Sequence, residues 1–81
     1  MPYREVDFLI VHIRAGLTWS RIAATSHHEA RRQRGRAQAR KAYDRALALQ
    51  EKAALKQNEA ARVRTNMEYL RSELRRLGED V

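Results

Sequence analysis

The feature that most constrains this chain is a stripe of apolar residues in its C-terminal half, which recurs at alternating spacings of four and three. Such a heptad pattern predicts an α-helix that buries one seam against another helix. Lys56 is the polar exception within the stripe. The apolar members, which we predict to form a dimerisation seam, are Ala42, Ala46, Leu49, Ala53, Ala60, Val63, Met67, Leu70, Leu74 and Leu77.

Composition agrees with a helical fold and excludes several others. The chain has 81 residues, enough for one small domain, with 33% charged residues and one Pro, at position 2. Three Gly are too few for a turn-rich β sandwich or barrel, and the lack of Cys excludes a disulfide scaffold, a thiolate zinc site and a cysteine nucleophile. We therefore predict an all-α fold, in which short helix-turn-helix-like N-terminal helices precede one long heptad-repeat helix, a coiled coil.

The heptad pattern leaves two arrangements open. A helix running unbroken from 27 to 77 would be about 75 Å long at ~1.5 Å per residue, too long for the preceding residues to cover. We therefore favour a homodimer joined by a coiled-coil helix at residues 42–78. A break near Asn58 would instead allow a monomeric hairpin, although the heptad phase runs through Asn58 without a slip.

Positive charge is concentrated ahead of the stripe. The net charge is +7, and residues 31–41 carry basic side chains without one acid. Basic residues without acidic neighbours repel one another, so we expect them to bind an external anion. In helical register they divide into two edges, which are Arg32, Arg36 and Arg40 on one side and Arg31, Arg34 and Lys41 on the other.

The N-terminal residues predict two short helices. The apolar residues in 6–17 follow the period of an amphipathic helix, and Gly16 is placed to end it. Thr18 is a suitable N-cap for a second helix over residues 19–25. A third helix is expected to begin at His27, because Ser26 and Glu29 have the spacing of a capping box.

A local string within these helices carries a resemblance. Residues 16–23 read GLTWSRIA. This string resembles the opening of helix-turn-helix modules in small bacterial DNA-binding proteins, in which a GL(S/T)W..IA stretch joins the first helix to the second. The resemblance covers residues 5–36, with the turn after the second helix shortened to Thr25-Ser26. It implies that residues 1–41 form a helix-turn-helix-like DNA-binding region whose third helix enters the major groove.

Together these features predict a DNA-binding protein, either a transcriptional regulator or a nucleoid-type protein, that binds duplex DNA as a coiled-coil dimer. Two alternatives stay open, namely a helical adaptor or inhibitor docking on an acidic protein partner and an RNA-binding protein acting through its Arg-rich helix. Trp19 could stack on a base, but we expect it to anchor the core. The predicted DNA-binding residues are Thr18, Arg21, Ser26, His27, His28, Arg31, Arg32, Arg34, Arg36, Arg40 and Lys41.

Other classes of site find no support in the sequence. His27 and His28 would point about 100° apart on a helix, which is unsuitable for chelation, so we predict no metal site. No Ser/His/Asp set or Gly-rich phosphate loop is present, and we predict neither enzymatic activity nor a cofactor. The longest apolar run, residues 8–11, is far short of the roughly 20 residues that span a bilayer. We therefore expect a cytoplasmic, nucleoid-associated protein without membrane contact.

Overall fold

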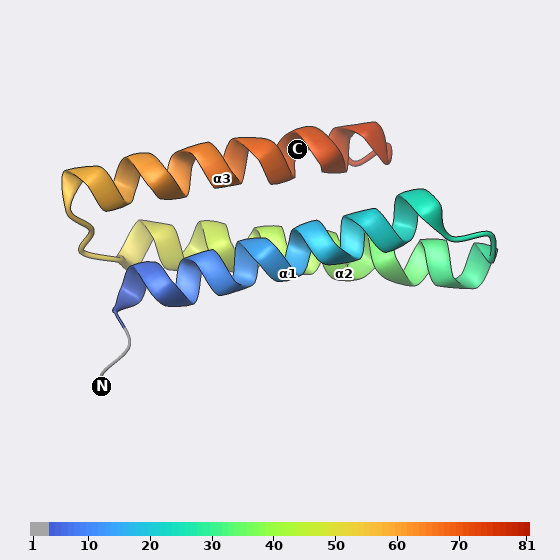
Figure 1. Ribbon diagram of the computed structural model, residues 1–81, viewed down its shortest axis with the longest axis horizontal. Coiled ribbons are helices and arrows are strands. Elements are labelled where there is room, and N and C mark those ends of the chain that lie inside the picture. Colours follow the sequence, from blue (N-terminus) through green and yellow to red (C-terminus); the bar gives the residue numbers. More distant parts are fainter. Residues whose placement is uncertain (1–3) are drawn as a thin grey trace.

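The computed structural model describes residues 4–81, which form three helices: α1 (Glu5–Thr25), α2 (Glu29–Lys52) and α3 (Gln57–Arg76). Helices α1 and α2 run antiparallel, and α3 lies along one side of this pair (Figure 1). The molecule measures 40 × 26 × 16 Å. The all-α prediction is confirmed, since residues 4–81 contain no strand.

Small residues bring α1 and α2 into close contact. A Cβ atom at Gly35 would lie 2.9 Å from the Trp19 carbonyl oxygen and 3.0 Å from the Ala23 amide nitrogen, so a side chain here would require the backbones to move apart. Ala42 and Ala46 of the heptad stripe are buried in α2, as is Ala39 one turn earlier. The alanine-rich part of the heptad stripe therefore belongs to the core that this chain forms by itself.

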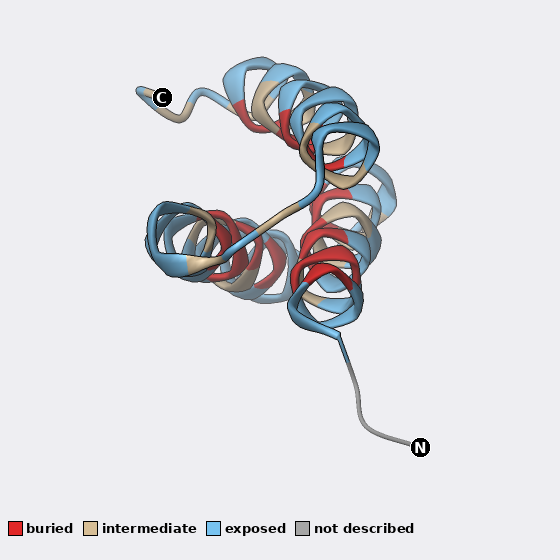
Figure 2. Ribbon diagram, turned by 90° about the vertical axis from the view of Figure 1, so that its left-hand side faces the viewer, coloured by how far each residue is buried: buried red, intermediate tan, exposed pale blue. Residues whose placement is uncertain are grey.

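Helix α3 covers the pair from one side with larger residues. Val63 and Leu70 are fully buried and belong to one apolar cluster with Leu9 and Ile13 of α1. Leu70 occupies the space left open by Gly16, where an added Cβ would lie 2.8 Å from Leu70 Cδ2. Figure 2 shows the consequence: the buried residues lie on the inner sides of the helices and the outer sides are exposed.

Helix α1 is continuous where the sequence predicted two helices. Gly16 does not end it, because that position lies inside the helix and its missing side chain admits Leu70. Thr18 does not cap a second helix, since its hydroxyl donates to the Arg14 carbonyl oxygen at 3.0 Å, a bond typical of Thr in a helix interior. The helix end at Gly16 and the cap at Thr18 are therefore wrong, and the helix-turn-helix arrangement is not confirmed.

The heptad-repeat region forms two helices rather than one. Residues 53–56 lie between α2 and α3 and reverse the chain (Figure 1). The fold-back alternative is therefore the one observed, with the break ahead of Asn58. The Glu59 carboxylate accepts a hydrogen bond from the Lys56 amide at 2.9 Å and so stabilises the start of α3. The polar member of the stripe thus lies where the helix is interrupted.

The stripe expected to join two chains packs largely within one chain. Leu49 is 39% exposed, and Ala53, Ala60 and Leu77 are half-buried. Because α2 folds against α1 and α3 folds back over both, one continuous coiled-coil helix over residues 42–78 does not form. The buried members of the stripe are Ala42, Ala46, Val63, Met67, Leu70 and Leu74.

Candidate functional site

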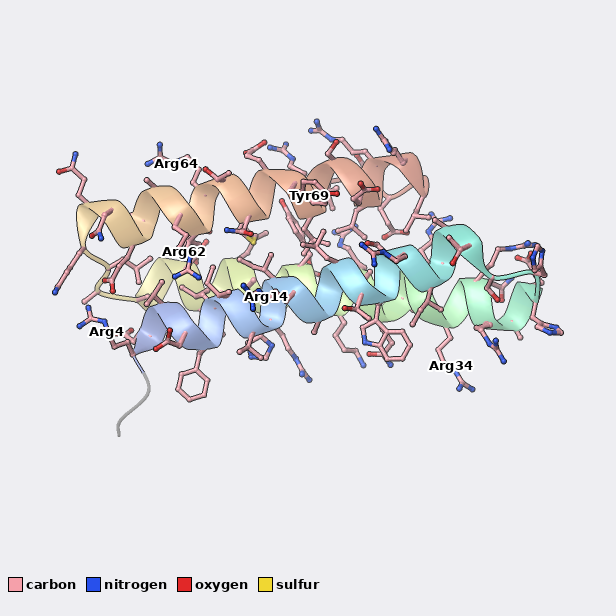
Figure 3. The ribbon with its side chains drawn as sticks, viewed as in Figure 1. Arg4, Arg14, Arg34, Arg62, Arg64 and Tyr69 are labelled. Carbon is pink, nitrogen blue, oxygen red and sulfur yellow. The ribbon has the colours of Figure 1, made fainter. Side chains whose placement is uncertain are left out.

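The basic residues of α2 lie on two edges of the helix, with the division that its register predicts. The first, which we call the paired edge, turns toward α3 and the C-terminal segment and comprises Arg32, Arg36 and Arg40. The second, which we call the open edge, lies on the side away from α3, as Arg34 shows in Figure 3. The open edge comprises Arg31, Arg34, Lys41 and Arg45.

The paired edge is neutralised by the chain itself. Arg36 forms an ion pair with Glu79 and donates to the Gly78 carbonyl oxygen at 3.1 Å. Arg40 contacts Glu79 at 3.2 Å and Asp44 at 3.1 Å. The hydrogen bond from Arg36 lowers the pKa of Glu79 against the opposing effect of partial burial, and Arg40 adds to that lowering.

Gly78 places Glu79 at the paired edge. Its φ of +93° is a left-handed conformation that glycine adopts readily. The Gly78 amide donates to the Arg75 carbonyl at 3.0 Å, and the Glu79 amide donates to the Leu74 carbonyl at 3.0 Å. These two bonds form a Schellman motif, which ends α3 and turns the chain toward α2.

The turn between α1 and α2 differs from the predicted capping box. The Ser26 amide donates to the last turn of α1 at 3.0 Å, while the Ser26 hydroxyl accepts from the His28 amide at 3.3 Å. The Glu29 carboxylate binds Arg32 instead of the Ser26 amide, and this hydrogen bond lowers the pKa of Glu29. Helix α2 consequently begins at Glu29 rather than at His27.

The open edge has no such partners. Arg31, Arg34, Lys41 and Arg45 are exposed, and none of them has an ion pair or side-chain hydrogen bond within residues 4–81. Gln38 lies between Arg34 and Lys41 on this edge, so no acidic residue interrupts the open edge. These cations extend along about 21 Å of helix at ~1.5 Å per residue. The result is an uncompensated row of positive charge.

Helix α1 contributes aromatic and apolar residues next to this row. Phe8, Val11, His12, Trp19 and Ile22 have the spacing of residues on one side of a helix. Phe8 is 50% exposed and Val11 is 56% exposed. We call the surface formed by this α1 ridge and the open edge the open face. It is the α1–α2 surface that α3 does not cover.

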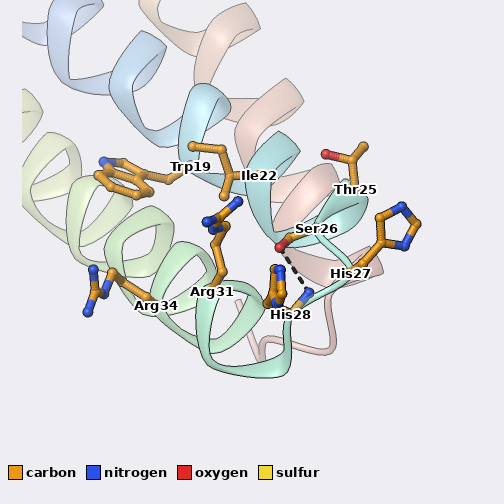
Figure 4. A pocket seen from close by; sticks show the side chains of 8 residues that line it. All are labelled: Trp19, Ile22, Thr25, Ser26, His27, His28, Arg31 and Arg34. Atoms are coloured by element: carbon orange, nitrogen blue, oxygen red, sulfur yellow. Dashed lines mark hydrogen bonds between the residues drawn. The ribbon is translucent and has the colours of Figure 1, made fainter.

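Hollows at both ends of the open face join α1 to α2. The smaller has a volume of about 190 Å³ and lies near the start of α1, between Glu5, Phe8, Leu9, His12, Leu49 and Ala53. The larger, which we call the turn hollow, has a volume of about 630 Å³. Figure 4 shows its lining from α1, the turn and α2, which consists of Trp19, Ile22, Thr25, Ser26, His27, His28, Arg31 and Arg34.

The structure brings together part of the predicted DNA-binding set. Lys41 continues the open edge away from the turn. The paired-edge arginines lie on the opposite side of α2 and are bound to carboxylates. Those gathered at the turn hollow are Ser26, His27, His28, Arg31 and Arg34.

Two predicted residues lie apart from this surface. Arg21 lines a separate hollow of about 320 Å³ with Tyr69 and Glu73 of α3. Thr18 is occupied by its bond within α1. The sequence pattern did not predict Arg45 as a binding residue, because it lies within residues 42–78, which were assigned to a coiled coil. The signal that could have identified it is its spacing of four residues from Lys41.

Within residues 4–81, no three His, Cys, Asp or Glu side chains are grouped so that they could hold a metal ion. None of the helices in this part of the chain has the length and hydropathy of a membrane-spanning segment. Comparison with protein-family models, curated proteins and solved structures finds no match to this chain.

Proposed function

We propose that this protein binds nucleic acid through the open face, with the open edge of α2 contacting backbone phosphates. The observation that carries the proposal is the contrast within α2, where acids bind one edge and, among residues 4–81, none binds the other. Exposed like charges in a row repel one another and attract a polyanion. Guanidinium groups bind phosphate oxygens through paired hydrogen bonds, which suits the arginines of this edge.

The length of the open edge favours a polymer over a small anion. Its cations recur along successive turns of α2, so one strand can contact several of them at once. Neutralising about four phosphates releases counterions, and the logarithm of affinity should then fall with the logarithm of salt concentration with a slope of about −3 to −4. We propose a single three-helix chain as the binding unit, because most of the seam expected to pair two chains is buried inside one.

The test is fluorescence anisotropy of a labelled oligonucleotide across a range of salt concentrations. Replacing Arg34 and Lys41 together by Gln should lower affinity about tenfold and reduce the salt slope by about one per cation. The matched control replaces Arg62 and Arg64, two exposed arginines of α3, by Gln. An equal loss in both double variants would show that net charge alone attracts the oligonucleotide and would refute binding by the open face.

A second candidate is an acidic, amphipathic helix of a partner protein. The observation that favours it is the exposure of Phe8 and Val11 beside the cations, since apolar anchors are typical of helix-in-groove recognition. Phe8→Ala distinguishes the candidates. It should leave a phosphate-driven complex within about twofold in affinity and weaken a helix–helix complex by about tenfold or more.

A further inference from the structure

We propose that the turn hollow receives an unstacked nucleobase, so that the preferred ligand is single-stranded nucleic acid. This inference rests on the proposed function and specifies the form of nucleic acid that the open face takes. The volume of the turn hollow, about 630 Å³, lies within the ~300–1,000 Å³ range of small-ligand sites. The hollow therefore has room for a base together with part of its sugar and phosphate.

Trp19 supplies a flat surface for stacking. Its side chain is partly buried and packs against the apolar core, while it also lines the turn hollow beside Ile22. Packing on the core restrains the indole, so it loses little freedom when a base stacks on it. Aromatic side chains that bind single strands work in this way, and they accept any base because every base has a π face.

Arg31 and Arg34 place positive charge at the same hollow. Figure 4 shows Arg31 extending from α2 toward Trp19 and Ile22, with Arg34 one turn further along the helix. Neither arginine has a carboxylate partner within residues 4–81. The nearest acid in sequence, Glu29, is occupied by Arg32 and by Gln33, whose amide donates to it at 3.1 Å. Both guanidinium groups are therefore available for the phosphates that flank a bound base.

The lining of the turn hollow favours a single strand over a duplex. Bases in a double helix expose their edges and hide their faces within the stack. The turn hollow lies between two helices and the loop that joins them, so a base must leave its stack to enter. From there the strand can continue along the open edge, past Arg34 toward Lys41. A path of about 21 Å contacts about four phosphates, which corresponds to the lower end of the ~4–16 nucleotides of single-strand sites.

Trp19 is the one tryptophan of the chain, so its fluorescence reports on this hollow directly. The full chain is titrated with oligothymidylate, with a blunt-ended duplex of equal phosphate count, and with thymidine monophosphate. Oligothymidylate should quench Trp19 emission to saturation, while the duplex should bind more weakly and leave the emission nearly unchanged. Equal quenching by the mononucleotide at the same concentration would overturn the assignment to a strand.

Variants separate stacking from charge. Trp19→Leu keeps apolar bulk and should lower affinity for oligothymidylate about tenfold, whereas Trp19→Phe should lose less. Neither should change affinity for the duplex. The matched control is Tyr69→Leu, which removes an aromatic that is 58% exposed on α3. Circular dichroism checks folding, and the quenching of the unaltered protein decides the question if Trp19→Leu does not fold.

The outcomes distinguish this inference from the proposed function. Binding that depends on Arg34 and Lys41 without Trp19 quenching, or with equal affinity for strand and duplex, would overturn the base-binding hollow and leave the phosphate-binding edge intact. A lack of any binding in the anisotropy and quenching experiments would overturn both.

Discussion

The two edges of α2 carry the same kind of side chain and differ in what the fold places opposite them. On the paired edge, Arg36 and Arg40 share Glu79, which arrives from the end of the chain. On the open edge, Arg31 and Arg34 face solvent at a hollow lined by Trp19. A guanidinium group that is paired with a carboxylate of the protein stabilises the fold. A guanidinium group without such a partner remains available to bind a ligand. The number of arginines in a helix therefore says less about binding than the carboxylates around them.

The largest effect is expected when the contact that holds α3 in place is weakened. Leu70→Ala should destabilise the protein by about 2–5 kcal/mol, because a fully buried side chain leaves a cavity beside Gly16. Chemical unfolding followed by circular dichroism measures this loss. Leu49→Ala is the control, and its 39% exposure predicts a smaller cost of about 1–1.5 kcal/mol. Similar costs at both positions would contradict the packing described for α3.

A smaller effect is expected where α1 and α2 touch. Gly35→Ala places a methyl group against backbone atoms of α1 at 2.9 and 3.0 Å, so the helices must separate. Overpacking of this kind destabilises a protein by about 1–3 kcal/mol. The higher helix propensity of alanine relative to glycine offsets up to about 1 kcal/mol of this loss. Gly16→Ala is the matched control, because its methyl group meets side-chain atoms, Cδ2 of Leu70 at 2.8 Å and Cβ of Ala42 at 3.3 Å, rather than backbone atoms. Thermal unfolding should show the lower midpoint for Gly35→Ala, and the reverse order would be inconsistent with this interface.

The comparison between edges is tested most directly by single charge removals. Arg34→Gln should weaken oligonucleotide binding about fivefold, as expected for one lost phosphate contact at physiological salt. Arg36→Gln should change affinity less than twofold, because Arg36 is engaged with Glu79. The two proteins have the same net charge, so net charge cannot explain a difference. Equal losses in anisotropy titrations would mean that the two edges are functionally alike.

The smallest effect is expected when the paired edge is released. Glu79→Gln should raise oligonucleotide affinity about two- to threefold, since Arg36 and Arg40 lose their shared acid. Stability should change by less than about 1 kcal/mol, as for other ion pairs near the protein surface. Reduced affinity in this variant would show that Glu79 supports binding instead of opposing it.

The same ion pairs predict a dependence of stability on pH. Arg36 lowers the pKa of Glu79 in the folded protein, so the unfolded chain binds that proton more tightly than the folded one. The stabilisation is therefore complete above the ordinary glutamate pKa of ~4.3 and is lost as the pH falls through the lowered value. Unfolding measured from neutral pH to about pH 3 should show a smaller acid-induced decrease in Glu79→Gln than in the unaltered protein.

Part of the candidate site could be read from the sequence because it depends on one helix alone. Arg34 and Arg36 lie on different edges of α2 at 100° per residue in any surroundings. The break before α3 could not be read in the same way. Ala53 and Ala54 favour a helix, no Gly or Pro marks the turn, and the heptad spacing continues through it. Packing of the two halves of the stripe within one chain outweighs that local preference.

The sequence by itself determined that this chain is helical, that the heptad stripe supplies buried residues such as Val63 and Leu70, and that α2 carries positive charge on two edges. These properties follow from periods of about 3.6 residues and from neighbouring side chains. Only the tertiary structure decided which edge is neutralised. Glu79 is separated from Arg36 by 43 residues and from Arg40 by 39, and it reaches them after α3 folds back and Gly78 turns the chain. Contacts over such separations depend on how the helices pack. Helix packing is decided by the burial of many side chains across the whole chain, and no local sequence pattern contains that information.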